Sequence, residues 1–180
     1  ATHQHFCQPE LLMPDNSALW EWTVDVYGRD GVAERSLWFQ DERAANVPLM
    51  LFICWAAMQG VAPDRALLAR ARQVTTLWHK EVVVPLRQLR CVLKADSKGI
   101  PVERARRFRD EVKSLELEAE RVELDTLGRL LEGSGSEDAD PSTQQKMMFE
   151  GLARYLDSLP ASTGELDHDR ITQLVDAITS

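Results

Sequence analysis

One stretch of this sequence limits the possible folds more than any other: the twelve uncharged residues from Val47 to Met58, all apolar if Pro48 is counted among them. A helix that spans a bilayer needs about 20 apolar residues, so the stretch is too short for a membrane span. Its Ala, Leu and Met residues favour a helix over a strand. A helix that is apolar on every face is normally buried. We therefore predict a core helix at about residues 47–59, with a partner interface as the second interpretation.

The composition supports a soluble chain with a sizeable core. Of its 180 residues, 44% are hydrophobic and 28% are charged. The net charge of −8 argues against a protein that binds nucleic acid over its whole surface. Three widely spaced cysteines form no disulfide framework. No basic segment precedes an apolar one at the start, as a signal peptide would require. We expect a cytoplasmic protein that does not bind membranes.

Helical periodicity continues beyond the apolar stretch, and no segment shows the alternation of a strand. The sequence predicts helices at about residues 17–27, 32–41, 47–59, 63–95 and 102–132. Pro85 should kink the fourth helix, because a proline lacks the N–H group and its ring displaces a carbonyl. The two long helices are joined by "DSKGIP" and should pair as an antiparallel hairpin. In the fifth helix the apolar stripe drifts to Leu117 and Leu124, which suggests packing against more than one neighbour.

The segment "EGSGSEDADPSTQQ" marks a boundary after the hairpin, because its start is acidic and rich in Gly and Ser. Asp140-Pro141 has the pattern of an N-cap and first turn. Leu166, Asp167 and Ile171 have the spacing of a hydrophobic staple around a second N-cap. Two short helices follow the boundary and must dock on the body, on each other or on a partner.

The predicted fold is therefore an all-α helical bundle with a long antiparallel helical hairpin and two short C-terminal helices. We divide it into an N-terminal arm, a helical domain, a flexible acidic linker and a two-helix tail: 1–15, 16–132, 133–145 and 146–180.

The motifs "LWEWTVDVYGRDGV", "LWFQDE", "LMLFICWAAMQG" and "LWHKEVVVPLRQLRCVLK" follow one another between Leu19 and Lys94. In this order and spacing the stretch resembles a proteobacterial family known as a domain of unknown function. The family commonly has Asp-Val-Asn where this chain has Asn46-Val47-Pro48. The resemblance implies a shared helical fold and a bacterial origin, but no reaction. It ends at about Lys94.

Acid–base chemistry has a weak candidate set in Asp41, His79 and Glu81. His79 could act as a base that Asp41 or Glu81 orients. The structural alternative is that Asp41 pairs with Arg87 or caps the next helix. No nucleophile elbow, zinc-protease, P-loop or dinucleotide motif occurs in the sequence. We therefore name no catalytic residue and expect no cofactor.

A small-molecule pocket between the second, third and fourth helices is an alternative. Its candidate lining residues are Gln40, Asp41, Trp55, Trp78 and Arg87. Tryptophans at helical spacing more often fill a core, and we expect this of Trp22, Trp55 and Trp78. At the N-terminus, His3, His5 and Cys7 could ligate a metal ion, but no fourth ligand is evident and the sequence predicts no metal site.

Charge is distributed unevenly along the chain. Residues 65–113 hold thirteen of the 21 Lys and Arg residues and five acids, a local charge of +8, and the rest of the chain carries −16. The basic residues are densest where the hairpin turns, and the candidate binding residues are Arg90, Lys94, Arg104, Arg106 and Arg107. Such a patch can serve an acidic protein partner or nucleic acid, or it can be neutralised by the protein's own acids.

The leading functional hypothesis is a non-enzymatic protein-interaction or regulatory factor, and an acidic protein ranks ahead of nucleic acid as its partner. The first alternative is a small-molecule-binding protein or enzyme that uses the pocket described above. The second is a nucleic-acid-associated regulator that uses the basic end of the hairpin. The sequence does not define an oligomeric state.

Overall fold

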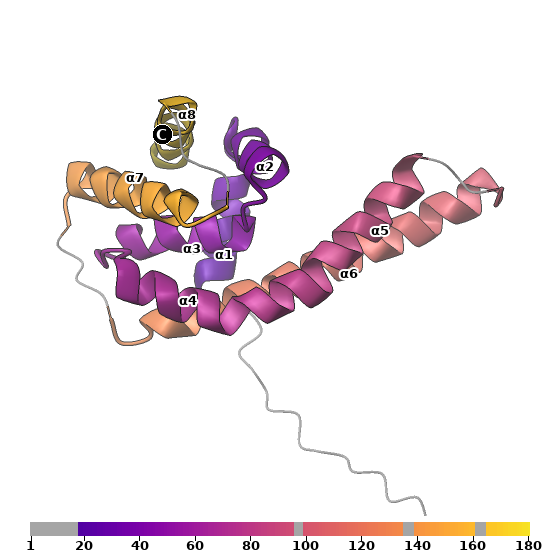
Figure 1. Cartoon of the computed structure of the whole chain (residues 1–180), viewed down its shortest axis with the longest axis horizontal. Coiled ribbons are helices and arrows are strands. Elements are labelled where there is room, and N and C mark those ends of the chain that lie inside the picture. Colours follow the sequence, from indigo (N-terminus) through magenta and orange to yellow (C-terminus); the bar gives the residue numbers. More distant parts are fainter. Residues whose placement is uncertain (1–17, 96–98, 135–138, 161–164) are drawn as a thin grey trace, which may run out of the picture.

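The computed structural model describes residues 18–95, 99–134, 139–160 and 165–180, and within these ranges it contains helices and no strand (Figure 1). The predicted all-α class is therefore confirmed. The α-helices are α1 (Ala18–Tyr27), α2 (Val32–Arg43), α3 (Val47–Met58), α4 (Arg65–Trp78), α5 (Val84–Ala95), α6 (Val102–Gly128), α7 (Pro141–Asp157) and α8 (Glu165–Thr179). A π-helical turn (His79–Val83) joins α4 to α5, and a short 3-10 turn (Arg129–Leu131) follows α6.

Helix α3 is the centre of the core, as its apolar sequence predicts. All its residues are buried except Trp55 and Met58, which are partly exposed. Asn46 caps the helix, because its side-chain Oδ1 accepts a hydrogen bond of 3.1 Å from the N–H of Leu49. Helices α1, α2, α6 and α7 pack around α3 (Figure 1).

The two C-terminal helices belong to this same core. Leu152 and Leu156 of α7 and Ile171 and Leu174 of α8 are fully buried, in one cluster with Phe52 of α3. Helix α7 lies along α3, and α8 contacts both α7 and α2 (Figure 1). The tail helices therefore dock both on the body and on each other.

The sequence predicts the N-cap of one C-terminal helix correctly and the N-cap of the other incorrectly. Asp140 is an N-cap as predicted, since its carboxylate accepts hydrogen bonds from the N–H groups of Ser142 and Thr143 at 3.0 and 3.1 Å. The prediction of an N-cap at Asp167 was wrong. Helix α8 begins two residues earlier, at Glu165, and the buried Asp167 forms an ion pair with Arg43 of α2.

The predicted disturbance near Pro85 takes the form of the π-helical turn directly before it. The N–H of Val84 donates to the carbonyl of His79, five residues earlier rather than four. Pro85 has no N–H to continue a regular ladder, and its ring would crowd the carbonyl of residue 81 in an ideal α-helix. One extra residue in the turn accommodates the ring, so the chain continues from α4 into α5 without ending.

Helix α5 packs along α6, and together they extend well away from the body (Figure 1). We call α5 and residues 102–115 of α6 the projecting hairpin. Along this stretch the buried apolar residues of α6 are small or medium in size, namely Ala105 and Val112. Small side chains at these positions let the two helices approach closely.

The three tryptophans predicted for the core differ in burial. Trp22 and Trp55 are partly buried against the core cluster. The prediction for Trp78 was wrong, because Trp78 is 38% exposed at the end of α4. Its indole N–H donates to the carbonyl of Ala119 at 2.9 Å, so the ring lies against the side of α6 and not between the helices of the body.

Candidate functional site: the projecting hairpin and the groove at its base

A network of ion pairs joins α5 to α6 at the base of the projecting hairpin. The Nε of Arg87 donates to Glu116 at 3.0 Å, and its Nη2 donates to Glu120 at 2.7 Å. Arg90 donates to both carboxylate oxygens of Glu116. Glu116 thus receives hydrogen bonds from two guanidinium groups, which is the strong, bidentate form of an ion pair. The network fixes the position of the hairpin on the body.

The two carboxylates of this network have opposite pKa shifts. Burial acts to raise the pKa of Glu116, but hydrogen bonds from Arg90 and Arg87 and their charges outweigh burial, and the pKa lies below its usual 4.5. Burial raises the pKa of Glu120 above that value, because its contact with Arg87 offsets only part of the desolvation. Glu116 is therefore the carboxylate that holds its charge most firmly.

The basic residues at the end of the projecting hairpin differ in their partners. Arg106 is engaged on its own helix, where it pairs with Glu103 at 2.7 Å and with Asp110 at 3.7 Å. Arg104 and Arg107 are exposed and form no ion pair with any described residue, and the same holds for Lys94. Of the five predicted binding residues, these three therefore present free charge to solvent, whereas Arg90 belongs to the network at the base.

Large apolar side chains are exposed along the same hairpin. Phe108 and Leu115 of α6 are 51% and 59% exposed, and Val122 continues the same row at the next seven-residue step. Residues seven apart lie on one face of a helix, so the three form a stripe. Leu89 and Val92 of α5 are also exposed. A row of large exposed apolar side chains is typical of interaction sites in folded proteins.

A groove with a volume of about 500 Å³ opens where the projecting hairpin meets the body. Helices α1, α2 and α3 form one side of it, and α5 and α6 form the other. Its floor includes the buried Val47, Leu51 and Leu124, and its charged side carries the Arg87 network. The groove thus combines an apolar floor with a few polar groups, as sites for small molecules commonly do.

Two of the five predicted pocket residues line this groove, namely Gln40 and Arg87. Asp41 is exposed on α2, next to Gln40 but outside the lining. Trp55 and Trp78 also lie outside it. Sequence reasoning missed the wall supplied by α1 and most of the wall supplied by α6. The drift of the apolar stripe to Leu117 and Leu124 was the available signal, because both residues line the groove.

His79 belongs to a buried polar network. Its Nδ1 lies 3.0 Å from a carboxylate oxygen of Glu123, a fully buried residue of α6. The other oxygen of Glu123 accepts a hydrogen bond from the side chain of Asn46, whose backbone N–H donates to the hydroxyl of Tyr155 at 2.8 Å. The network thereby ties together four elements, α3, the π-helical turn, α6 and α7.

The three residues of the predicted acid–base set therefore do not come together in the structure. Neither Asp41 nor Glu81 is the partner of His79, and both are exposed. His79 lines neither the groove nor the second cleft described below.

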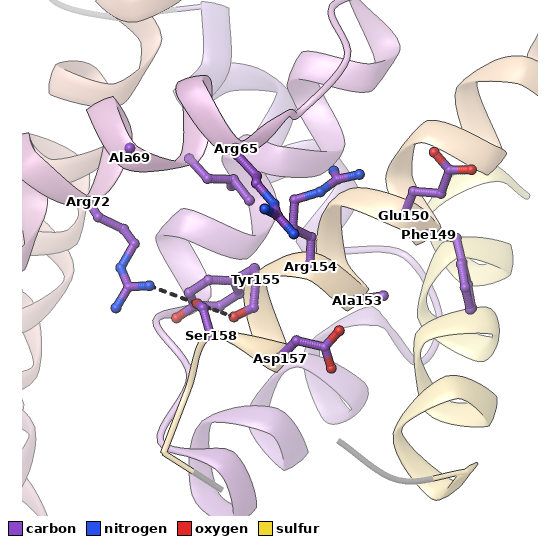
Figure 2. Close-up of a pocket in the computed structure, with 11 residues that line it drawn as sticks. Arg65, Ala69, Arg72, Phe149, Glu150, Ala153, Arg154, Tyr155, Asp157 and Ser158 are labelled. Atoms are coloured by element: carbon purple, nitrogen blue, oxygen red, sulfur yellow. Dashed lines mark hydrogen bonds between the residues drawn. The ribbon is translucent and has the colours of Figure 1, made fainter. Parts of the chain in front are cut away.

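A second cleft, of about 630 Å³, lies between α4 and α7 (Figure 2). Figure 2 shows Arg65 of α4 reaching toward Arg154 of α7, and Arg72 of α4 reaching toward Ser158 at the end of α7. Arg72 donates to the Oγ of Ser158 at 2.7 Å, and Arg154 donates to the carbonyl of Pro63 at 2.7 Å. Two of the three arginines thus hold α7 against the start and middle of α4, and acidic side chains from α7 line the same cleft.

No group of three or more metal-ligating side chains occurs among the residues that the model describes. The weak candidates His3, His5 and Cys7 lie outside those residues. Over the same described ranges, every helix is too short or too polar to cross a bilayer.

The fold and these surfaces define an all-helical protein with a projecting hairpin and an open groove at its base. The chain belongs to the family described as "Protein of unknown function (DUF2390)", whose model matches residues 18–127. The predicted resemblance is thereby confirmed. Its end at about Lys94 was wrong, because the match continues through most of α6, although it stops before α7 and α8. No curated protein and no solved structure matches the chain.

Proposed function

We propose that this protein is a non-enzymatic protein-binding factor, and that its projecting hairpin holds an apolar segment of a partner protein that also carries acidic residues. One observation carries the proposal. The hairpin leaves the body and places a stripe of exposed apolar side chains beside arginines that have no partner among the described residues (Figure 1).

The apolar stripe favours a protein partner over nucleic acid. Contacts to a phosphate backbone need positive charge, but they gain nothing from Phe108 or Leu115. Protein interfaces, in contrast, combine an aromatic or aliphatic centre with charged residues at the rim. The rest of the chain carries −16 and would repel phosphate once more than a few contacts were required.

The exposed arginines favour acidic residues in the partner. A guanidinium group can bind a carboxylate through two parallel hydrogen bonds, and it loses less hydration than an ammonium group does. Arg104 precedes Phe108 by one turn on the same face of α6, and Arg107 directly precedes Phe108 in the sequence. A partner helix with apolar residues and a carboxylate at one end fits this order.

The test compares two hairpin variants with a matched control in a quantitative enrichment experiment on extracts of the source cells. Arg104→Glu/Arg107→Glu reverses the free charge, and Phe108→Ser/Leu115→Ser interrupts the stripe. Arg70→Glu with Lys80→Glu changes the net charge as much as the first variant does, at exposed positions outside the hairpin. The same partner protein should be lost with both hairpin variants and retained with the control.

Once that partner is purified, its affinity should fall as salt rises, because free charges contribute at the rim. Two results would contradict the proposal. One is a partner set that neither hairpin variant changes. The other is tight binding of duplex DNA that Arg104→Glu/Arg107→Glu abolishes and Phe108→Ser/Leu115→Ser does not affect, which would assign the surface to nucleic acid.

A further inference from the structure

The groove at the base of the hairpin is separate from the stripe proposed for the partner protein. Leu117 lines the groove, whereas Leu115 does not, and two residues along a helix differ in direction by about 200°. Exposed apolar side chains from three helices border the groove, since Val24, Leu37 and Leu117 are between 42% and 56% exposed. Three elements that converge with exposed apolar groups around one hollow form a site for an apolar ligand.

The polarity of the groove changes along its length. The lining residues of α6 extend from Leu124 near the body to Lys113 on the hairpin, a distance of roughly 16 Å along the helix axis. Among the lining residues, Trp20 lies against Arg121, three residues before Leu124, and Arg87 and Arg90 pair with Glu116, three residues after Lys113. The groove is therefore apolar at its body end and cationic at its hairpin end.

The charges at the hairpin end do not cancel. Three cations and two carboxylates line the groove, and both carboxylates accept hydrogen bonds from Arg87 or Arg90. Lys113 is exposed and forms no ion pair with any described residue. An excess of one positive charge at the mouth fits a ligand with one anionic headgroup.

A buried hydroxyl supplies an independent sign of a ligand. Thr23 of α1 lines the groove, is only 7% exposed, and its Oγ1 has no hydrogen-bond partner among the described residues. Other helical threonines, such as Thr75 and Thr126, donate to the carbonyl four residues earlier. A buried hydroxyl without a partner costs about 1–3 kcal/mol. A polar group on a bound molecule would remove this cost.

The position of Thr23 indicates where that polar group belongs. Tyr27 follows Thr23 by one helical turn, about 6 Å, on the same face of α1. Tyr27 is close enough to Glu120 and Arg87 for their charges to act on its hydroxyl. Thr23 therefore lies about one turn inward from the charged end, so the matching polar group on the ligand lies a few bonds from its headgroup.

We propose that this groove binds a small amphiphilic molecule with an apolar chain, one anionic headgroup and a hydroxyl or carbonyl group close to that headgroup. The headgroup lies at Lys113 and Arg90, the hydroxyl of Thr23 binds the second polar group, and the chain extends toward Trp20 and Leu51. A volume of about 500 Å³ is within the range of small-molecule sites. A hydroxylated fatty-acid anion has this chemistry.

The test is isothermal titration calorimetry of the full chain with 3-hydroxydodecanoate below its micelle concentration. Two comparison ligands separate the contributions: dodecanoate lacks the hydroxyl, and dodecanol lacks the charge. We expect saturable binding of one molecule per chain, tightest for the hydroxy acid. Thr23→Val should remove the preference for the hydroxy acid over dodecanoate, which we expect to be about fivefold from one hydrogen bond of roughly 1 kcal/mol.

Two pairs of variants localise the binding. Leu117→Trp fills the groove from an exposed position and should weaken binding about tenfold or more, whereas Leu115→Trp on the other side of α6 should leave it unchanged. Lys113→Glu should weaken binding of the acid by about tenfold, whereas Lys80→Glu should not. Circular dichroism checks that each variant remains folded.

Three results would overturn the proposal. The first is the absence of saturable binding of either acid. The second is equal weakening by Leu117→Trp and Leu115→Trp, which would place the ligand outside the groove. The third is binding of dodecanol as tight as that of 3-hydroxydodecanoate, which would remove the need for the cations.

Discussion

Replacement of Gly151 by alanine tests whether α7 is part of the core. In a free helix this change stabilises by about 1 kcal/mol, because alanine is the better helix former. In this structure a Cβ at position 151 would lie 2.5 Å from the Cγ of Pro63 and 2.8 Å from the Cγ2 of Ile53. Both contacts are far shorter than van der Waals contact. The proline ring is rigid and Ile53 is fully buried, so neither group can move away without a shift of the helices.

The expected magnitude follows from these opposing terms. Overpacking of a close-packed site costs about 1–3 kcal/mol, and three contacts below 3 Å, two of them with Pro63, place Gly151→Ala at the upper end of that range. Subtracting the gain in helix propensity leaves a net loss of about 2 kcal/mol. For a chain of this length, such a loss lowers Tm by roughly 4–8 °C.

Thermal unfolding followed by circular dichroism measures this effect, and the exposed Lys146 in the same helix supplies the control. Lys146→Ala should be more stable than Lys146→Gly by about 1 kcal/mol, which gives the intrinsic preference for alanine in α7. If Gly151→Ala stabilised the protein to the same extent, α7 could not lie against Pro63 and α3, and the reasoning would be refuted.

Three further predictions concern polar and titratable groups. Tyr155→Phe leaves the backbone N–H of Asn46 without its buried acceptor and should cost about 1–3 kcal/mol in chemical unfolding, whereas an unchanged stability would contradict the network. Because the pKa of Glu116 is lowered in the folded protein, its ionised carboxylate stabilises the fold above pH 4.5, the usual pKa of a glutamate. This stabilisation is lost as the pH falls through the lower pKa of the folded state. In acid titrations of stability, Glu116→Gln should therefore lose less stability than the unsubstituted protein does. Burial raises the pKa of the Cys54 thiol to about 12. In a variant without the N-terminal cysteine, a maleimide should therefore label the exposed Cys91 at neutral pH and label Cys54 only after unfolding. Rapid labelling of both cysteines would show that α3 is not buried.

Local patterns in this sequence predict the helices well. The apolar stretch from Val47 to Met58 has no polar face and is too short to span a membrane, so burial in the core was the leading prediction, and the structure confirms it. Asp140-Pro141 starts α7 because capping depends on residues adjacent in sequence. Pro85 disturbs its helix for a reason internal to the backbone. Each of these features is decided within a few residues of the chain.

The sequence did not predict which side chains pair when they lie far apart along the chain. His79 has acids at nearby positions in the sequence, yet its partner is Glu123, 44 residues further along. A buried glutamate in a helix rich in exposed glutamates has no local signature, because its burial depends on which helix packs over it. Asp167 similarly has the spacing of a cap, but its buried ion pair with Arg43 decides its role.

The groove was predictable only in part for the same reason. Periodicity places Leu115 and Leu117 on opposite sides of one long helix but does not show which helices border either side. Thr23 has no distinguishing sequence feature, since its missing hydrogen bond appears only in the folded structure. A site assembled from five helices requires their relative positions, and no local pattern contains that information.

The central claim is that the projecting hairpin contacts a partner protein, and site-specific photo-crosslinking in the source cells tests it most directly. A photoreactive phenylalanine analogue replaces Phe108 in one variant and the exposed Gln73 of α4 in a second, control variant. We expect an adduct with one defined protein at position 108, mapped by mass spectrometry to a segment with apolar and acidic residues, and its loss when Arg104→Glu/Arg107→Glu is added. Equal adducts at both positions, or none at position 108, would contradict the account.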